Sequence, residues 1–348
     1  MDAFYASVEL LRRPELAGCP VIVGGRGDPG ARGVVTTASY EARAYGVKSG
    51  MPLRTAARLC PQAVFLPADF DEYRRLSRRF KAAVARIASA IEDRGIDEIY
   101  IDLSSVPGVE VEGGGPLARE IKHEVYQHTG LSCSIAVAPN KLLAKIASEL
   151  DKPDGLTLLR PDDLETRIWP LPAKRVNGIG PKAAARLEAL GIRTIGDIAR
   201  ADLAWLVEHF GANYGAWLHR ASHGRDEREV VTESEPRSIS RETTFERDLS
   251  ATRDRAELSA IFTDLCVRLA GDLQRKGYAG RTIGIKLRFD NFTTVTRDQT
   301  IETPTQDAAA IRRAAGECLK RVPLARRIRL LGVRMGTLTP ATVPRDTG

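Results

Sequence analysis

A polar segment at residues 223–240 (HGRDEREVVTESEPRSIS) divides the chain, and this division constrains the fold more than any other feature. The segment carries no apolar periodicity, so we expect a linker there rather than a helix or a strand. After it, residues 241–340 follow the order strand, helix, strand, strand, helix, strand. This βαββαβ order predicts a compact unit that folds independently of the residues before the linker.

Two patterns precede the linker. Up to about residue 165, short apolar strands alternate with amphipathic helices, one of them a long helix expected over 72–92. This pattern predicts an α+β layout, with an antiparallel sheet and helices on one face. From 166 to 222 the pattern is wholly helical, with short elements and Gly-containing connections.

The positive charge of the chain is concentrated after the linker. The formal net charge is +7, and residues 237–340 contain 20 Lys and Arg against 12 Asp and Glu, whereas the remainder contains 32 against 33. A positive field confined to one unit is expected of a unit that binds a polyanion such as DNA, although a basic surface can also serve solubility alone.

The composition excludes several other classes of protein. The sequence contains no run of 18 or more uncharged apolar residues, so no membrane span is predicted. The N-terminal sequence MDAFYASVELLRRPE lacks the basic and then apolar segments of a secretory signal. The five cysteines are scattered, without a C-x-x-C pair, which argues against a disulfide framework or a zinc site and predicts a cytoplasmic protein.

Two adjacent carboxylates, Asp97 and Glu98, begin an expected strand in the sequence GIDEIYID. Neighbouring strand residues point to opposite faces, so the two acids can serve one metal centre only at a turn or strand end, which Gly95 permits. Carboxylate oxygens suit Mg²⁺, and a pair of such ions can activate a 3′-hydroxyl and stabilise a leaving pyrophosphate. An Asp-Glu pair is more often a solvated surface feature, so the pair alone does not establish a site.

The sequence NGIGPK (177–182) predicts a phosphate-binding turn. Gly178 and Gly180 would expose backbone N–H groups at a helix N-terminus, and Lys182 adds a positive charge nearby. This arrangement is typical of a helix-hairpin-helix that binds a DNA phosphate without reading sequence. A Gly-x-Gly between helices can also be only a turn.

Five motifs occur in order along the chain: MDAFYASVE (1–9), TTASYEARAYGVKSGMP (36–52), IDEIYIDLS (96–104), SIAVAPNKLLAKIASELDKPDG (134–155) and NGIGPKAAARLEALGI (177–192). Together they closely resemble the Y-family DNA polymerases, most of all the DNA polymerase IV (DinB) branch. The resemblance implies a right-hand polymerase, and it covers the whole chain. Its expected parts are a ferredoxin-like palm (1–10 and 67–165), small fingers (11–66), a helical thumb with the helix-hairpin-helix (166–222) and a separate little-finger domain (241–340).

The resemblance also implies roles for individual residues. Asp97 and Glu98 match the catalytic acids that coordinate the metal ions. Tyr5 matches the aromatic residue that lies against the sugar and excludes a 2′-hydroxyl, and Phe4 packs beneath it. The residues that match positions binding the incoming nucleotide triphosphate are Tyr40, Arg43 and Lys152, with Thr37 as a weaker candidate on the same loop.

DNA-binding residues are expected in both halves of the chain. In the thumb these are Gly178, Gly180 and Lys182. In the last unit, the strand 281–289 alternates apolar residues with Lys286 and Arg288, so a basic outer face can lie along a duplex backbone. Arg241 and Thr243 match the start of the first little-finger strand, which faces the template.

The sequence departs from the family pattern near both ends. The family has a metal-binding aspartate two residues before the position of Asp2, where this chain starts; Met1 can offer only its backbone carbonyl to the metals. A numbering that starts at an internal methionine, a trimmed chain, or a short protein with weak or no catalysis would each explain this. The last residues, TPATVPRDTG, lack the tail by which many relatives bind the sliding clamp, so clamp binding is in doubt.

The function expected from the resemblance is template-directed DNA synthesis. A monomer would add deoxynucleotides to the primer 3′ end of a primed DNA template, using two Mg²⁺ ions, with low fidelity and tolerance of damaged templates. One rival is a DNA-binding protein on the same fold that has lost its metals. A second is a cyclase-type nucleotidyl transferase, which would need neither the NGIGPK turn nor the basic last unit.

Overall fold

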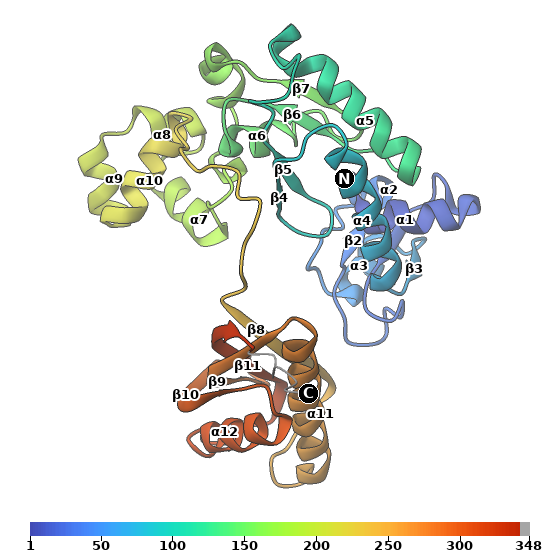
Figure 1. Cartoon of the computed structure of the whole chain (residues 1–348), viewed down its shortest axis with the longest axis vertical. Coiled ribbons are helices and arrows are strands. Elements are labelled where there is room, and N and C mark those ends of the chain that lie inside the picture. The colour runs from blue at the N-terminus through green and yellow to red at the C-terminus, as the bar shows by residue number, and fades with distance from the viewer. Residues whose placement is uncertain (342–348) are drawn as a thin grey trace, which may run out of the picture. The chain divides into compact units, whose positions relative to one another are not determined.

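The computed structural model describes residues 1–341 as two compact units, the first spanning Met1–Glu233 and the second beginning at Ser234 (Figure 1). We call them the N-terminal unit and the C-terminal unit. Within the described residues, no helix has the length and apolar character needed to cross a membrane. All five cysteines are unpaired.

The first part of the N-terminal unit is a small sheet covered by short helices. Its elements are α1 (Phe4–Arg12), η1 (Pro14–Leu16), β1 (Val21–Val23), β2 (Thr37–Ala38), α2 (Tyr40–Ala44), α3 (Leu53–Leu59) and β3 (Val64–Leu66). The strand order is β2-β1-β3, with β1 antiparallel to β2 and parallel to β3. Ile22, Val35 and Leu53 are fully buried in the core beneath this sheet.

The next part carries the carboxylate pair. Its elements are α4 (Phe70–Ala85), β4 (Ile91–Asp93), β5 (Ile99–Ile101), η2 (Val111–Gly114), α5 (Gly115–Thr129), β6 (Ile135–Val137), α6 (Lys141–Ala147) and β7 (Leu156–Leu158). Strands β4 and β5 form an antiparallel hairpin, whereas β6 and β7 are parallel. The expected antiparallel sheet is therefore wrong at β6 and β7, as it is at β1 and β3. Between β6 and β7, α6 forms the crossover that parallel strands require.

The helix expected over 72–92 ends earlier, at Ala85. Residues Ile91–Asp93 instead pair with Ile99–Ile101 as strand β4. The amphipathic pattern of the sequence continues past Ala85, but the pairing of residues 91–93 with β5 overrides the helical preference.

The helical part follows as expected. Its elements are η3 (Pro161–Asp163), η4 (Leu164–Ile168), η5 (Ala173–Arg175), α7 (Pro181–Ala189), α8 (Ile195–Arg200), α9 (Leu203–Phe210) and α10 (Ala212–Ser222). Its core also includes Leu142, Leu143 and Ile146 of α6, so this helix packs into the core of the helical part. Thr194 and Asp197 form a capping box that fixes the start of α8.

The C-terminal unit has the predicted βαββαβ order. Its elements are β8 (Ser238–Leu249), α11 (Arg255–Arg275), β9 (Tyr278–Phe289), β10 (Thr294–Thr305), α12 (Ala308–Lys320) and β11 (Ile328–Pro340). The sheet order is β10-β9-β11-β8, and every pair is antiparallel. The predicted alternation of β9 holds, because Ile283, Ile285 and Leu287 are buried in one core with residues of α11 and α12.

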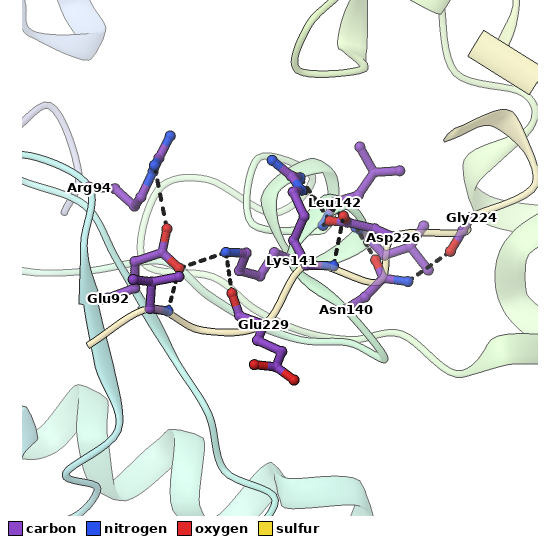
Figure 2. A network of polar contacts seen from close by, with 11 residues as sticks. Glu92, Arg94, Asn140, Lys141, Leu142, Gly224, Asp226 and Glu229 are labelled. Carbon is purple, nitrogen blue, oxygen red and sulfur yellow. Dashed lines mark hydrogen bonds and ion pairs between the residues drawn. The ribbon is translucent and has the colours of Figure 1, made fainter. Parts of the chain in front are cut away.

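The connection between the units is shorter than the linker expected at 223–240. Helix α10 ends at Ser222 and β8 already begins at Ser238. Residues 224–231 also form several hydrogen bonds with the rest of the N-terminal unit (Figure 2). The expectation about the clamp-binding tail falls largely on residues 342–348, which lie outside the described residues.

Candidate active site

The carboxylate pair lies at the tight turn of the β4–β5 hairpin, directly before β5. The turn is closed by a hydrogen bond of 3.1 Å from the Arg94 N–H to the Glu98 carbonyl and by one of 3.0 Å from the Gly95 N–H to the Asp93 carboxylate. Gly95 has φ of 150°, a value that side-chain-bearing residues rarely adopt. The two acids are therefore at a strand end, where both can approach one centre.

The two carboxylates have different partners. Glu98 is paired with Lys145 of α6. Burial alone would lower the pKa of Lys145, but the bond to Glu98 raises it overall, so this lysine is a firmly held cation. Within residues 1–341 the half-buried Asp97 carboxylate has no hydrogen-bond or ion-pair partner. The backbone carbonyl of Asp97 accepts a hydrogen bond of 2.8 Å from the terminal ammonium of Met1.

The chemistry of this pair suits a hard divalent cation. Both side chains offer carboxylate oxygens, and Lys145 already occupies a position at Glu98 where positive charge is stabilised. Among the residues that the structure describes, no cluster of three or more His, Cys, Asp and Glu side chains is arranged to hold a metal. A cation here would therefore depend on these two acids, on backbone oxygen and on the oxygens of a substrate.

Tyr5 lies beside this pair in an aromatic cluster. Its ring is 4.5 Å from that of Tyr73 and 5.8 Å from that of Phe70, between centroids, and Phe4 is almost fully buried next to it. The Tyr73 hydroxyl donates 2.7 Å to the buried carboxylate of Glu9, which fixes the cluster. Burial and then the nearby Asp97 carboxylate raise the pKa of Tyr5, so the ring is neutral and close to the acid pair.

Tyr40 and Arg43 stand together on α2. Ser39 caps this helix by accepting from the Ala42 N–H, and the guanidinium carbon of Arg43 lies 4.8 Å from the centre of the Tyr40 ring. The Tyr40 hydroxyl is buried and has no hydrogen-bond partner among the described residues. A buried hydroxyl left unpaired costs about 1–3 kcal/mol, so this atom indicates a position that a ligand would complete.

Lys152 and Thr37 lie on other segments of the same region. Lys152 forms an ion pair of 2.8 Å with Glu149, and Thr37 is buried on β2. Burial alone would raise the pKa of Glu149, but Lys152 holds it lowered. Since Glu149 also acts electrostatically on Tyr40, the lysine and the unpaired hydroxyl belong to one neighbourhood.

Asp2 has a structural role that the sequence did not predict. It is 2% exposed, and its carboxylate accepts hydrogen bonds from Ser132 Oγ at 3.1 Å, Ser134 Oγ at 2.7 Å and the Asp154 N–H at 2.9 Å. It thus joins the start of the chain to the approach to β6 and to the loop that carries Lys152. The alternating serines of LSCS are the only local signal, and they do not identify their partner.

The NGIGPK turn begins helix α7, with Gly180 as its N-cap and Pro181 in its first turn. Gly178 has φ of 115°, and a Cβ atom there would lie 2.7 Å from the Trp217 indole. The Tyr214 hydroxyl donates 2.9 Å to the Gly178 carbonyl, so α10 holds the turn in place. No Cβ contact occurs at Gly180, and Lys182 is exposed.

The open face of the C-terminal sheet is less basic than expected. Lys286 donates to Glu242 at 2.9 and 3.1 Å, and both residues lie opposite Gly332 in the register. Arg288 instead bonds the neutral hydroxyl of Thr294 at 3.0 Å, so its charge is not compensated by an acid there. Arg288 is therefore the stronger phosphate-binding candidate of the two.

Arg241 and Thr243 lie on the other face of that sheet. They are paired in register with the buried Val333 and Leu331, so their side chains point to the helix-covered side. The guanidinium of Arg241 is bound by the buried carboxylate of Asp272 on α11. β8 is an edge strand, so its outer backbone groups have no partner strand in the sheet that the structure describes, and its exposed side chains on the open face include Ser240 and Thr244.

Comparisons with known proteins agree with this architecture. Residues 1–149 match the model of the impB/mucB/samB family, residues 236–346 match the C-terminal domain of that family, and residues 174–226 match the thumb domain of DNA polymerase-iota. The DNA polymerase IV of Methanoculleus marisnigri is 44% identical over 339 residues, covering 97% of this chain and 92% of that protein. The DNA polymerase IV of Alkalilimnicola ehrlichii is 41% identical, with 98% and 94% covered.

Solved structures give the same result. A chimeric Y-family DNA polymerase superposes with a TM-score of 0.83 at 27% identity, covering 97% of each chain. An insertion ternary complex of the Dbh DNA polymerase gives a TM-score of 0.68 at 28% identity, again with 97% of each chain covered.

Proposed function

The chain belongs to the Y family of DNA polymerases, in the DNA polymerase IV branch, and from this premise we propose how its residues carry out synthesis on damaged DNA. It is a DNA-directed DNA polymerase whose substrates are primed DNA and deoxynucleoside triphosphates. The observation that carries the proposal is the Tyr40 hydroxyl, which is buried beside Arg43 and has no hydrogen-bond partner among residues 1–341.

The nucleotide pocket is formed by residues from three segments. The Tyr40 hydroxyl would donate to a phosphate oxygen. The Arg43 guanidinium donates from Nε to the Ala38 carbonyl at 3.0 Å, and its other N–H groups would serve the triphosphate. Lys152 would exchange Glu149 for a phosphate, which offers more negative charge. The Tyr5 ring, fixed against Tyr73, leaves no room for a 2′-hydroxyl.

Asp97 and Glu98 would hold the divalent cations, which we propose to be two Mg²⁺ ions, with the Met1 carbonyl as a further oxygen ligand. Such cations, when bound, lower the pKa of the primer 3′-hydroxyl and neutralise charge on the phosphates. The chain's own contribution is an Asp97 carboxylate that no described residue engages in a hydrogen bond or ion pair, and a Glu98 carboxylate that is held in place by Lys145.

Contacts with the duplex come from both units. The N–H groups at the start of α7, with Lys182, suit one backbone phosphate, and Arg288 of the C-terminal unit suits another. None of these contacts reads a base, as synthesis on any template requires. The DNA-binding role of β8 would rest on its backbone near Arg241 and Thr243, because the Arg241 side chain is engaged by Asp272.

Primer extension with Mg²⁺ on a primed template tests this proposal. The Asp97→Asn variant is expected to lower the extension rate at least 100-fold, with the affinity for DNA unchanged within about twofold. Asp264→Asn is the control, since it removes the same charge from an exposed carboxylate on α11 of the C-terminal unit, 3.5 Å from Arg268. Its extension rate should stay within about threefold of the parent protein.

The main alternative is a relative that binds DNA without catalysis. That alternative would be favoured if the parent protein bound primed DNA at sub-micromolar concentration yet gave no extension with Mg²⁺ or Mn²⁺. If the parent protein and Asp97→Asn extended the primer at equal rates, Asp97 would have no catalytic role, although the polymerase activity itself would be established.

A further inference from the structure

Residues 224–231, which we call the strap, leave the last helix of the N-terminal unit and then run along α6 and β4 instead of projecting into solvent (Figure 2). Four hydrogen bonds join the strap to these elements: Asn140 Nδ2 to the Gly224 carbonyl at 2.7 Å, the Leu142 N–H to Asp226 Oδ2 at 3.0 Å, Lys141 Nζ to the Glu229 carbonyl at 2.6 Å, and the Val231 N–H to Glu92 Oε2 at 2.9 Å. The strap is thus bound along its length, from its first residue to its last.

A buried ion pair lies at the centre of these contacts. Lys141 Nζ is 2.6 Å from Glu92 Oε2, and the two side chains are only 10% and 8% exposed. Charges removed from water need all of their hydrogen-bonding positions filled, and here the strap fills two of them, at the Glu229 carbonyl and the Val231 N–H. The ion pair and the bound strap therefore depend on each other.

The same helix also supports the catalytic acids, through a different residue. One helical turn after Lys141, Lys145 is paired with Glu98, which directly precedes β5 of the same hairpin. The ion pair that holds the strap is therefore separate from the one at the acids, and a variant of the first can be tested without removing the second.

We propose that Glu92 and Lys141 are positioning residues that hold the strap on the N-terminal unit and so shorten the free connection to the C-terminal unit to residues 232–237. Six residues span at most about 20 Å, whereas the fourteen residues 224–237 of a released strap span up to about 50 Å. The effective concentration of a tethered site falls roughly as the −3/2 power of tether length, which is about three- to fourfold here.

This inference rests on the proposed function in one respect, that both units bind one DNA molecule. Release of the strap would then weaken the binding of primed DNA about three- to fourfold, since the C-terminal unit would search a larger volume. The rate of nucleotide insertion at saturating DNA and nucleotide would stay the same, because Lys145 and the acid pair are untouched.

Limited proteolysis with a glutamate-specific protease tests the holding of the strap without any need for activity. Glu227 lies in the strap, whereas Glu233 and Glu235 lie in the free segment. Lys141→Met and Glu92→Gln are each expected to raise the cleavage rate at Glu227 at least tenfold, with the rates at Glu233 and Glu235 unchanged. Unchanged cleavage at Glu227 in both variants would refute the proposal.

Glu229→Gln is the matched control, because Glu229 contributes only its backbone carbonyl and its carboxylate points away from the network (Figure 2). Its cleavage at Glu227 and its DNA affinity should equal those of the parent protein. If Glu92→Gln or Lys141→Met fails to fold, Asp226→Ala is the alternative variant. It removes the hydrogen bond from the Leu142 N–H at the N-terminus of α6 and should give the same increase in cleavage at Glu227.

The affinity for primed DNA and the single-turnover insertion rate are measured on the same full-length variants. Together they distinguish a longer tether, which lowers only the affinity, from damage to the catalytic site, which lowers the rate. A three- to fourfold weaker Kd with an insertion rate within twofold of the parent protein supports the proposal. Faster cleavage with unchanged Kd would overturn the tether argument. A tenfold loss of insertion rate at saturation, with Kd unchanged, would show that Lys141 supports the acid-bearing hairpin instead. A protein that bound DNA but never inserted nucleotide would contradict the proposed function while leaving the cleavage and Kd tests intact.

Discussion

Replacing Asp2 with alanine should strongly destabilise the N-terminal unit. The Asp2 carboxylate is buried and accepts three hydrogen bonds, two from the Ser132 and Ser134 hydroxyls and one from the Asp154 N–H. Hydrogen bonds to a charged acceptor contribute about 1.5–3 kcal/mol each, but the serine hydroxyls can rotate to other acceptors once the carboxylate is gone. The Asp154 N–H cannot, so the expected loss is about 3–5 kcal/mol.

Urea unfolding followed by tryptophan fluorescence measures this loss in the correct unit. All three tryptophans, Trp169, Trp205 and Trp217, belong to the N-terminal unit, so the C-terminal unit does not contribute to the signal. With a slope of about 3 kcal/mol per M urea, the midpoint should fall by about 1–1.7 M. Asp28→Ala is the control, since the Asp28 carboxylate accepts from the Gly30 N–H in an exposed turn, and it should cost less than about 1 kcal/mol.

The reasoning would be refuted by an Asp2→Ala midpoint within about 0.3 M of the parent protein, because three hydrogen bonds lost in a buried site cannot be replaced by water at that cost. Asp2→Asn gives a graded check. The amide keeps one acceptor oxygen and the shape of the side chain, so its midpoint should lie between those of the parent and Asp2→Ala.

Three further predictions concern DNA binding and the C-terminal unit. Gly178→Ala should weaken DNA binding at least fivefold in a fluorescence anisotropy titration, because the new Cβ would lie 2.7 Å from the Trp217 indole and φ at this position is 115°. Unchanged binding would show that this turn does not contact DNA. Arg241→Ala should destabilise the C-terminal unit by about 1–3 kcal/mol in calorimetry, since it leaves the buried Asp272 with one cation fewer. The bond to Arg241 lowers the pKa of Asp272, so this contribution is present above the unfolded value of 3.8 and is lost as the pH falls below it; equal losses at pH 6 and pH 2.5 would contradict that. Arg288→Ala should reduce DNA affinity and its salt dependence more than Lys286→Ala, whose charge Glu242 already compensates, and the reverse order would contradict this assignment.

Much of the fold could be predicted from local patterns. The alternation of Ile283, Ile285 and Leu287 with Lys286 and Arg288 fixed which face of β9 is buried, because side chains alternate along any strand. The glycines of NGIGPK predicted a turn at a helix start for an equally local reason, since few other residues adopt the backbone angles of Gly178. The ordered motifs then indicated the family, and the comparisons confirmed it.

The partners of the charged residues could not be predicted in this way. The sequence identified Asp97 and Glu98 as a pair, but only the folded chain places Lys145 against one of them and leaves the other free. Arg241 looked like a DNA-binding residue, yet its strand register turns it toward Asp272. In each case the partner lies tens of residues away, and many equivalent charges compete for it.

The same distinction explains the connection between the units. The polar composition of residues 223–240 correctly excluded a helix or strand through most of the segment, and it predicted a free linker. Whether a polar segment is free depends on whether a distant surface offers matching groups, and here Glu92 and Lys141 do. The sequence alone determined most of the segments that form elements and which face of each is apolar, because those depend on backbone geometry and near neighbours, whereas the end of α4 and the start of β4 depended on strand pairing. Tertiary structure decided the charge pairing, the strap and the role of Asp2, because burial makes a polar group depend on the few partners that the fold brings within reach.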